Sequence, residues 1–152
     1  MSAIDDLLLF RAVDDAPRSA IAGRLLDEGM AGRGWRHGGQ VDLWEVRDAA
    51  GAIDEEPVAV AATRPLGDGR RVRLVAVVVA PSRRGRGIGR QMIEDLADAL
   101  RAQGALSLVA AVPSDQAGAI VVMQRARLRP SHVERANPET DGRDLVWFDL
   151  EL

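Results

Sequence analysis

The residues of this chain best suited to chemistry form a short segment rich in glycine and arginine. The segment is Arg84-Gly85-Arg86-Gly87-Ile88-Gly89, with Arg83 before it and Arg90 after it. Glycine adopts positive φ without steric cost and lets a backbone approach a ligand closely. Backbone N–H groups combined with fixed positive charge bind anions, and a pyrophosphate would satisfy the whole arrangement.

The elements on either side of this segment favour a ligand site. The apolar run from about Arg70 to Ala80 predicts a strand, which Pro81 ends because proline lacks the N–H that a sheet needs. A helix is predicted from about Gly87 to Gln103, since apolar residues recur there at helical spacing. The first N–H groups of a helix have no internal partner, so they face an anion with partial positive charge. A solvated basic turn, or one that touches RNA, is the alternative interpretation.

Two better-known phosphate-binding loops fit the segment poorly. A P-loop requires a lysine after its last glycine, and the chain contains no lysine. A dinucleotide-binding turn requires a third glycine where Met92 stands, and about half of the chain precedes the motif. Asp115 is the one residue that supports a dinucleotide-binding oxidoreductase, as a ribose-binding acid beyond the next strand.

The rest of the sequence predicts a single α/β or α+β domain over residues 1–152. The predicted order is strand, helix, strand, strand, strand, helix, strand, helix, strand, strand, which defines a mixed sheet with helices packed on it. The predicted strands span residues 7–13, 41–46, 58–63, 70–80, 106–112, 128–135 and 144–152. The predicted helices span about 14–30, 87–103 and 114–126, the last capped by Ser114 or Asp115, and Pro65–Gly69 is a predicted turn.

Composition restricts the class of protein. The chain is 47% hydrophobic and 28% charged, which suits a folded domain with a buried core. The absence of cysteine excludes disulfides and a cysteine acyl-enzyme, and two histidines make a metal site unexpected. A formal charge of −3 gives no attraction to nucleic acid. No apolar run reaches the roughly 20 residues of a membrane helix, so we expect no membrane partner. All 20 basic residues are arginine, which indicates a GC-rich, bacterial type of coding, and we expect a cytoplasmic bacterial protein.

Taken with its flanking elements, the segment resembles the signature of the GNAT superfamily of acyl-CoA N-acyltransferases. That signature is Gln/Arg-x-x-Gly-x-Gly/Ala after a strand that ends in Val-x-Pro, and here Val79-Ala80-Pro81 precedes Arg84 to Gly89. The resemblance covers nearly the whole chain. It implies a mixed, mostly antiparallel central sheet that is splayed between its fourth and fifth strands, with flanking helices.

The resemblance also implies a co-substrate and the residues that hold it. Acetyl-CoA would donate its acyl group to a small-molecule or peptide amine by direct attack, with no metal, and a homodimer through the terminal strands is an expectation. The pantetheine would pair with backbone in the splay, and N–H groups of the glycine–arginine segment would hold the pyrophosphate. The implied coenzyme A contacts are Val77, Val78, Val79, Arg84, Gly85, Arg86, Gly87, Ile88, Gly89, Arg90, Gln116, Ala119 and Met123.

The catalytic acid and base of the family have no clear counterpart in this chain. The family's second segment, Asn-x-x-Ala-x-x-x-Tyr-x-x-x-Gly-Phe, falls on Gln116 to Leu128, where Met123 replaces the acidic tyrosine and Arg127-Leu128 replaces Gly-Phe. Ser114 or water is the substitute acid. The position of the family's strand glutamate falls on or near Arg73.

Other side chains are candidates for the base or for the amine pocket. The candidate bases are Glu45 and Asp42, which are otherwise solvated strand carboxylates, and His37 and His132, which are otherwise surface histidines. Trp35 and Trp44 line an amine pocket or pack in the core, and Trp147 is expected in the core. Since the family's tyrosine and strand glutamate are both missing, a catalytically weak domain that binds acyl-CoA as a sensor or interaction module is the alternative function.

Overall fold

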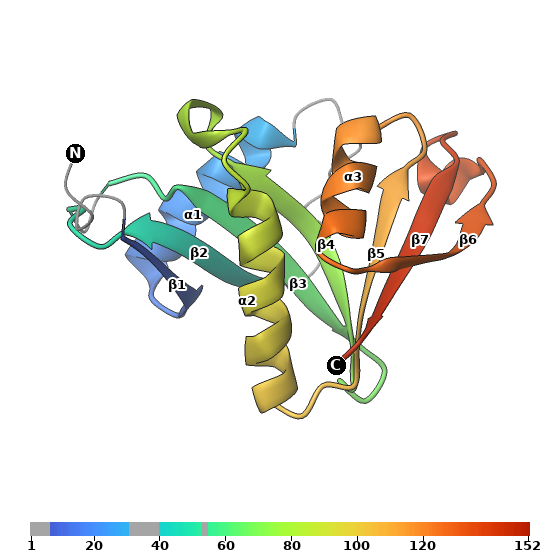
Figure 1. The fold of residues 1–152 in the computed structure, drawn as a ribbon, viewed down its shortest axis with the longest axis horizontal. Helices are drawn as coiled ribbons and strands as arrows, with labels where there is room; N and C mark the ends of the chain where they lie inside the picture. Colours follow the sequence, from blue (N-terminus) through green and yellow to red (C-terminus); the bar gives the residue numbers. More distant parts are fainter. Residues whose placement is uncertain (1–6, 31–39, 53–54) are drawn as a thin grey trace. The chain divides into compact units, whose positions relative to one another are not determined.

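The structure, a computed structural model, describes residues 7–30, 40–52 and 55–152. The helices are α1 (Ala16–Gly29), α2 (Ile88–Ala102) and α3 (Ala117–Arg125), and short 3-10 turns span Pro81–Arg83 and Pro138–Thr140. The strands are β1 (Leu8–Val13), β2 (Asp42–Asp48), β3 (Ala59–Leu66), β4 (Arg71–Val79), β5 (Ser107–Pro113), β6 (Arg129–Glu134) and β7 (Leu145–Glu151). Figure 1 labels these elements, and their order along the chain is the predicted one.

The strands form one mixed sheet in the order β1-β2-β3-β4-β5-β7-β6. Antiparallel ladders join β1 to β2, β2 to β3, β5 to β7 and β6 to β7, while β4 and β5 are parallel. A mixed, mostly antiparallel sheet with helices is therefore confirmed. None of the helices in the described ranges is long and apolar enough to cross a membrane.

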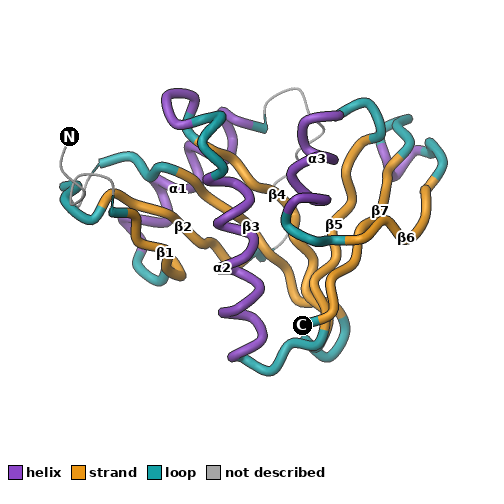
Figure 2. The backbone as a smooth tube through the Cα atoms, in the orientation of Figure 1, coloured by secondary structure: helices purple, strands orange, loops and turns teal. Residues whose placement is uncertain are grey.

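Local stereochemistry explains where the elements begin and end. The Asp15 side chain accepts the Arg18 N–H at 2.8 Å and caps α1, and Pro17 stands in the first turn, where a missing N–H costs nothing. Gly104 follows α2 with φ of 91°, a left-handed conformation that ends a helix. Figure 2 shows the loop that leads from α2 into β5.

Two predicted boundaries are wrong. Pro65 lies within β3, not in a turn, because it is exposed and its missing N–H is tolerated there. The turn comes later, where the Gly69 N–H donates to the Leu66 carbonyl at 3.0 Å. Helix α3 starts after Gln116, since the Asp115 carboxylate, instead of capping the helix, accepts from Arg143 at 2.7 Å.

The chain divides into two compact units, Met1–Thr63 with Ala76–Met92, and Arg64–Val75 with Ile93–Leu152. In the first unit, α1 packs on β2, and β3 is buried along most of its length. In the second unit, β5 and β7 pair along their whole length, and Leu108, Val109 and Phe148 are almost completely buried. Strand β4 and helix α2 run through both units.

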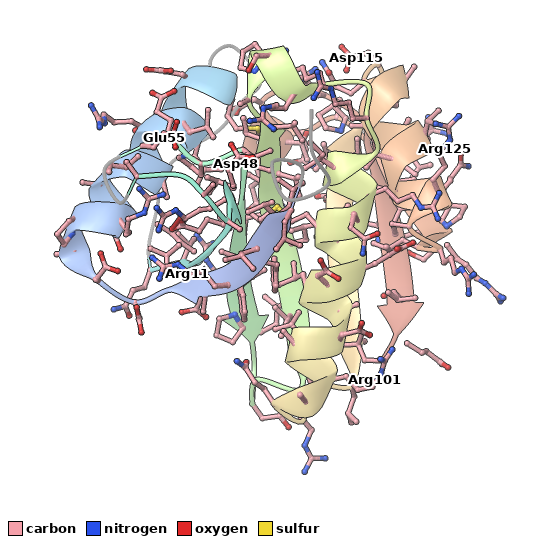
Figure 3. The ribbon with its side chains drawn as sticks, turned by 60° about the vertical axis from the view of Figure 1, so that its left-hand side comes forward. Arg11, Asp48, Glu55, Arg101, Asp115 and Arg125 are labelled. Carbon is pink, nitrogen blue, oxygen red and sulfur yellow. The ribbon has the colours of Figure 1, made fainter. Side chains whose placement is uncertain are left out.

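A buried ion pair joins α1 to β2 inside the first unit. Arg18 and Glu45 are 2% and 0% exposed, and their closest nitrogen and oxygen lie 2.5 Å apart. The Arg18 guanidinium also donates to the Glu55 carbonyl at 2.8 Å. Arg11 and Arg47 lie farther from the same carboxylate, at 3.8 and 3.6 Å, and Figure 3 labels Arg11 and Glu55. The pair fixes the helix against the strand.

Removing one partner of this pair should strongly destabilise the protein. We expect Glu45→Gln or Arg18→Met to lower the free energy of unfolding by about 3–5 kcal/mol, because a buried charge loses its closest partner. Urea denaturation followed by circular dichroism measures the change. The control is Arg101→Gln: Arg101 pairs with Asp98 on the surface of α2, so its loss should cost no more than about 1 kcal/mol. Equal losses in both variants would contradict the assignment.

Candidate functional site

The turn between β4 and α2 has the backbone geometry of an anion-binding loop. Gly85 and Gly87 adopt φ of 79° and 76°, a left-handed region that side chains rarely tolerate. A Cβ placed on either glycine would meet no atom within 4 Å, so the space beside both residues is open. The backbone of this turn is therefore exposed to a ligand rather than packed against the protein.

The N–H groups that open α2 have no acceptor inside the described part of the protein. The Gly87 carbonyl accepts from the Gln91 N–H at 3.0 Å, which begins the helical hydrogen bonding. No oxygen among the described residues accepts from the N–H of Gly87, Ile88 or Gly89. The Ile88 side chain is only 8% exposed, so it anchors the helix start, and Gly87 before it is exposed. Free N–H groups at the start of a helix are the groups that bind phosphates in other proteins, so this helix start is a candidate anion site.

The arginines of the segment do not all serve a ligand equally. Arg83 binds Asp48 of β2 at 2.6 Å, and its charge is therefore paired within the first unit. The Arg84 Nε donates to the Val79 carbonyl at 3.1 Å, which ties the turn to the end of β4. Arg86 and Arg90 are exposed. Two of the predicted ligand-binding arginines, Arg83 and Arg84, therefore hold the turn in place through contacts within the protein.

The residues of β4 predicted to contact coenzyme A, Val77–Val79, lie outside the β4–β5 ladder. The parallel ladder runs from Arg71 opposite Ser107 to Leu74 opposite Ala110. Strand β4 continues to Val79, and Val77–Val79 form no part of that ladder. The end of α1 packs closely on this part of β4, since a Cβ on Gly29 would collide with Val78. The arrangement agrees with the predicted splay between the fourth and fifth strands.

Helix α3 carries the residues predicted as the second cofactor segment. Gln116 is its N-cap and makes no side-chain capping bond, Ala119 is half-buried, and the Met123 side chain is 7% exposed. The helix ends in a left-handed Arg127 with φ of 71°. The Leu128 N–H donates to the Met123 carbonyl at 3.0 Å, which is the hydrogen bond of a Schellman motif. Arg127 thus occupies a conformation that glycine adopts without strain.

The candidate acid and bases stand in very different surroundings. Glu45 is not a solvated carboxylate, because it is fully buried and engaged by Arg18. Asp42 and Ser114 are exposed, and Asp42 begins β2. His132 is exposed as expected and stacks on Trp147, with ring centroids 5.9 Å apart. His37 and Trp35 lie outside the described residues.

The tryptophans separate into one core residue and one surface platform. Trp44 is 5% exposed, stacks on Phe10 at 5.6 Å and donates to the Thr63 hydroxyl at 2.9 Å, so it packs in the core. Trp147 is only half-buried, which corrects its expected place in the core. The Arg73 guanidinium carbon lies 5.0 Å from the centre of its ring.

Sequence reasoning missed the cluster around Trp147 because its members come from three strands. Glu134 of β6 accepts from Trp147 Nε1 at 3.0 Å and from Asn137 Nδ2 at 3.3 Å. These hydrogen bonds, that from Trp147 first, lower the pKa of Glu134, and the charges of Arg73 and His132 add to the effect. Burial lowers the pKa of Arg73, the neighbouring Arg64 lowers it further, and Glu134 raises it.

Comparison with known proteins identifies the family to which the chain belongs. The chain matches the model described as the Acetyltransferase (GNAT) family over residues 24–127. The match covers more than half of the chain, so the chain belongs to the GNAT acetyltransferase family. No curated protein matches the sequence.

Solved structures with the same fold include three acetyltransferases. The IAA acetyltransferase from Bacillus cereus is 14% identical with a TM-score of 0.76, covering 96% of this chain and 100% of that one. The Bacillus subtilis acetyltransferase in complex with CoA is 15% identical with a TM-score of 0.72, covering 96% and 99%. The ribosomal-protein-S18-alanine N-acetyltransferase from Escherichia coli is 19% identical with a TM-score of 0.71, covering 95% and 94%. At such identities the likeness shows the fold alone.

Replacing Arg127, the left-handed residue after α3, by glycine should stabilise the protein. We expect Arg127→Gly to raise the free energy of unfolding by about 1 kcal/mol, because glycine removes the steric cost of positive φ. Thermal and urea denaturation measure the change. Gln124→Gly, inside α3, is the matched control and should instead destabilise by about 1 kcal/mol. A stabilising effect of both glycines, or of neither, would contradict this interpretation of the helix end.

The lowered pKa of Glu134 predicts a pH-dependent contribution to stability. A carboxyl whose pKa is lower in the folded state stabilises fully above its unfolded value, ordinarily 4.5, and loses this effect as pH falls through the folded value. The stability advantage of the wild type over Glu134→Gln should therefore be largest near neutral pH and shrink below about 4.5. Denaturation from pH 7 to 3 measures it. Trp147→Phe removes the main donor and should weaken the dependence; if it does not, the hydrogen bond is not its cause.

Proposed function

We propose that this chain is an acetyl-CoA-dependent N-acetyltransferase that moves an acetyl group from coenzyme A to a primary amine. The observation that carries the proposal is the turn at the start of α2. Two glycines hold left-handed conformations there, three successive N–H groups lack an acceptor among the described residues, and open space lies beside them. Membership in the GNAT family and a solved structure of the same fold with CoA bound support the same ligand.

The residues present fit the pyrophosphate of coenzyme A. N–H groups of Gly87, Ile88 and Gly89 would donate to its oxygens, and the exposed Arg86 and Arg90 would supply charge. The pantetheine would pair with the backbone of Val77–Val79, which stands outside the β4–β5 ladder. Gln116, Ala119 and Met123 on α3 complete the proposed contacts. Bound acetyl-CoA supplies a thioester that a free amine attacks directly, forming the C–N bond as the C–S bond breaks.

This chain lacks the tyrosine and the strand glutamate that would act as general acid and general base in this reaction. Met123 has no proton to give, and the buried Glu45 is occupied by Arg18. The exposed Ser114, at the end of β5, or water would protonate the departing thiolate. Water would accept the proton of the amine, with the exposed Asp42 as the remaining carboxylate candidate. General acid–base catalysis typically contributes about 10²–10⁴-fold, so we expect a slow enzyme.

A negative side chain in the turn should prevent binding of acetyl-CoA. Gly87→Glu would fill the open space and repel the pyrophosphate, so its dissociation constant should rise at least about 100-fold. Isothermal titration calorimetry with acetyl-CoA measures the change.

The matched control is Gly67→Glu in the β3–β4 turn. Gly67 is also exposed and has φ of 56°, and a Cβ added to it would meet no atom within 4 Å. This variant has the same added charge and a comparable backbone strain, and it should bind acetyl-CoA normally. Unchanged binding by Gly87→Glu would mean that the turn does not hold the pyrophosphate.

A domain that binds acyl-CoA without substantial turnover is the second candidate. The buried Met123 at the position of the family tyrosine, and Arg73 at that of the strand glutamate, favour it. Release of free thiol from acetyl-CoA in the presence of a broad amine panel separates the two functions. Sustained release with any amine refutes the binding-only function, whereas tight binding without release supports it.

A further inference from the structure

Arg73 is a partly buried cation whose side chain makes no hydrogen bond or ion pair within the described part of the chain. It lies on β4 and alternates with buried neighbours, so it shares the half-buried side of the strand with Val75, Val77 and Val79. Its Nε atom is buried and has no hydrogen-bond partner. Within the described residues no carboxylate comes close enough to Arg73 to form an ion pair. Leaving a charged donor unsatisfied is costly, so such a group usually has a partner that the isolated chain lacks.

Glu134, the carboxylate whose charge acts on Arg73, is held by other donors. Glu134 has both oxygens engaged, one by Trp147 Nε1 at 3.0 Å and the other by Asn137 Nδ2 at 3.3 Å. Its charge acts on Arg73 only through space. Arg64, on β3 in the same unit, carries a second positive charge, which disfavours the charged form of Arg73. The surroundings of Arg73 therefore favour an additional anion.

Trp147 presents the Arg73 guanidinium to a ligand. The guanidinium carbon lies 5.0 Å from the ring centre, and His132 stacks on the same indole at 5.9 Å with planes 10° apart. A cation–π contact restrains a guanidinium without using its N–H donors. Arginine donors lie in one plane and match the two oxygens of a carboxylate. Arg73 is thus held in place with its N–H donors available to bind a carboxylate ligand.

We propose that Arg73 is a specificity-determining residue that binds a carboxylate of the acceptor, and that the acceptor is an amino acid. The inference rests on the proposed N-acetyltransferase function. The family resemblance places a glutamate base on or near Arg73, on the strand that carries the proposed pantetheine contacts. An arginine remains protonated and cannot act as that base, but it can fix an anionic acceptor there. The acceptor's α-amino group would then be the nucleophile.

Kinetics with matched acids and amides tests this proposal. The probes are the standard amino acids and their carboxamides, which keep the amine and lose the negative charge. For the amino acid that is turned over best, we expect kcat/KM about 10- to 100-fold above that of its carboxamide, the range expected for a charge-assisted hydrogen bond. Arg73→Gln should abolish this preference mainly through KM, and Arg73→Lys should restore part of it. Arg71→Gln removes an exposed arginine two residues away and should leave the preference intact.

Stability and cofactor binding distinguish a functional arginine from a structural one. Because Arg73 is unsatisfied, Arg73→Met should keep or raise the melting temperature and leave acetyl-CoA binding unchanged in calorimetry. A marked loss of stability would mean that Arg73 is structural and would overturn the proposal.

Each kinetic outcome also has a separate meaning. Equal turnover of acids and amides, a preference that survives Arg73→Gln, or turnover restricted to amines without a carboxylate overturns the acceptor assignment. So does the absence of any turnover of amino acids by protein that binds acetyl-CoA. Failure to bind acetyl-CoA at all refutes the underlying N-acetyltransferase function instead.

Discussion

The alternation of side chains along β4 is the constraint on which both halves of the candidate site depend. One side of the strand, with Val72, Leu74, Ala76 and Val78, is buried and fixes the strand in the protein. The other side is exposed at Arg71 and half-buried from Arg73 to Val79. Since a shift of one residue would exchange the two sides, the burial of four apolar side chains determines which residues remain available for ligands.

The turn after β4 joins the packed strand to the proposed ligand-binding start of α2. Pro81 stops β4, Arg84 ties the following turn to the Val79 carbonyl, and two left-handed glycines direct the backbone into α2. A helix that starts from such a turn leaves its first N–H groups without acceptors while Ile88 holds its apolar face in the protein. Neither the glycines nor the helix alone would form an anion site. The sequence order of strand, turn and helix is what brings the two features together.

The sequence predicted the order of elements and this turn because both follow from local rules. Periodicity determines helices and strands, and glycine spacing determines where the backbone can turn. It did not predict that Glu45 is buried, since the partner Arg18 lies 27 residues earlier and on a helix. It also missed the platform of Trp147, His132 and Glu134, because cross-strand neighbours depend on the register of β6 and β7. Long-range pairing, rather than propensity, limits such predictions.

The departures from the family pattern have different physical meanings. At Arg127 the backbone keeps the left-handed conformation that glycine would favour, so the motif's geometry survives at a cost in strain. At Met123 the side chain is buried, so an acidic hydroxyl has been exchanged for packing. At Arg73 a partly buried charge is retained although its Nε has no hydrogen-bond acceptor among the described residues, and a neutral side chain would be less costly there. Packing explains the methionine but not the arginine, and an unsatisfied charge that packing does not explain is best accounted for by the ligand it would bind.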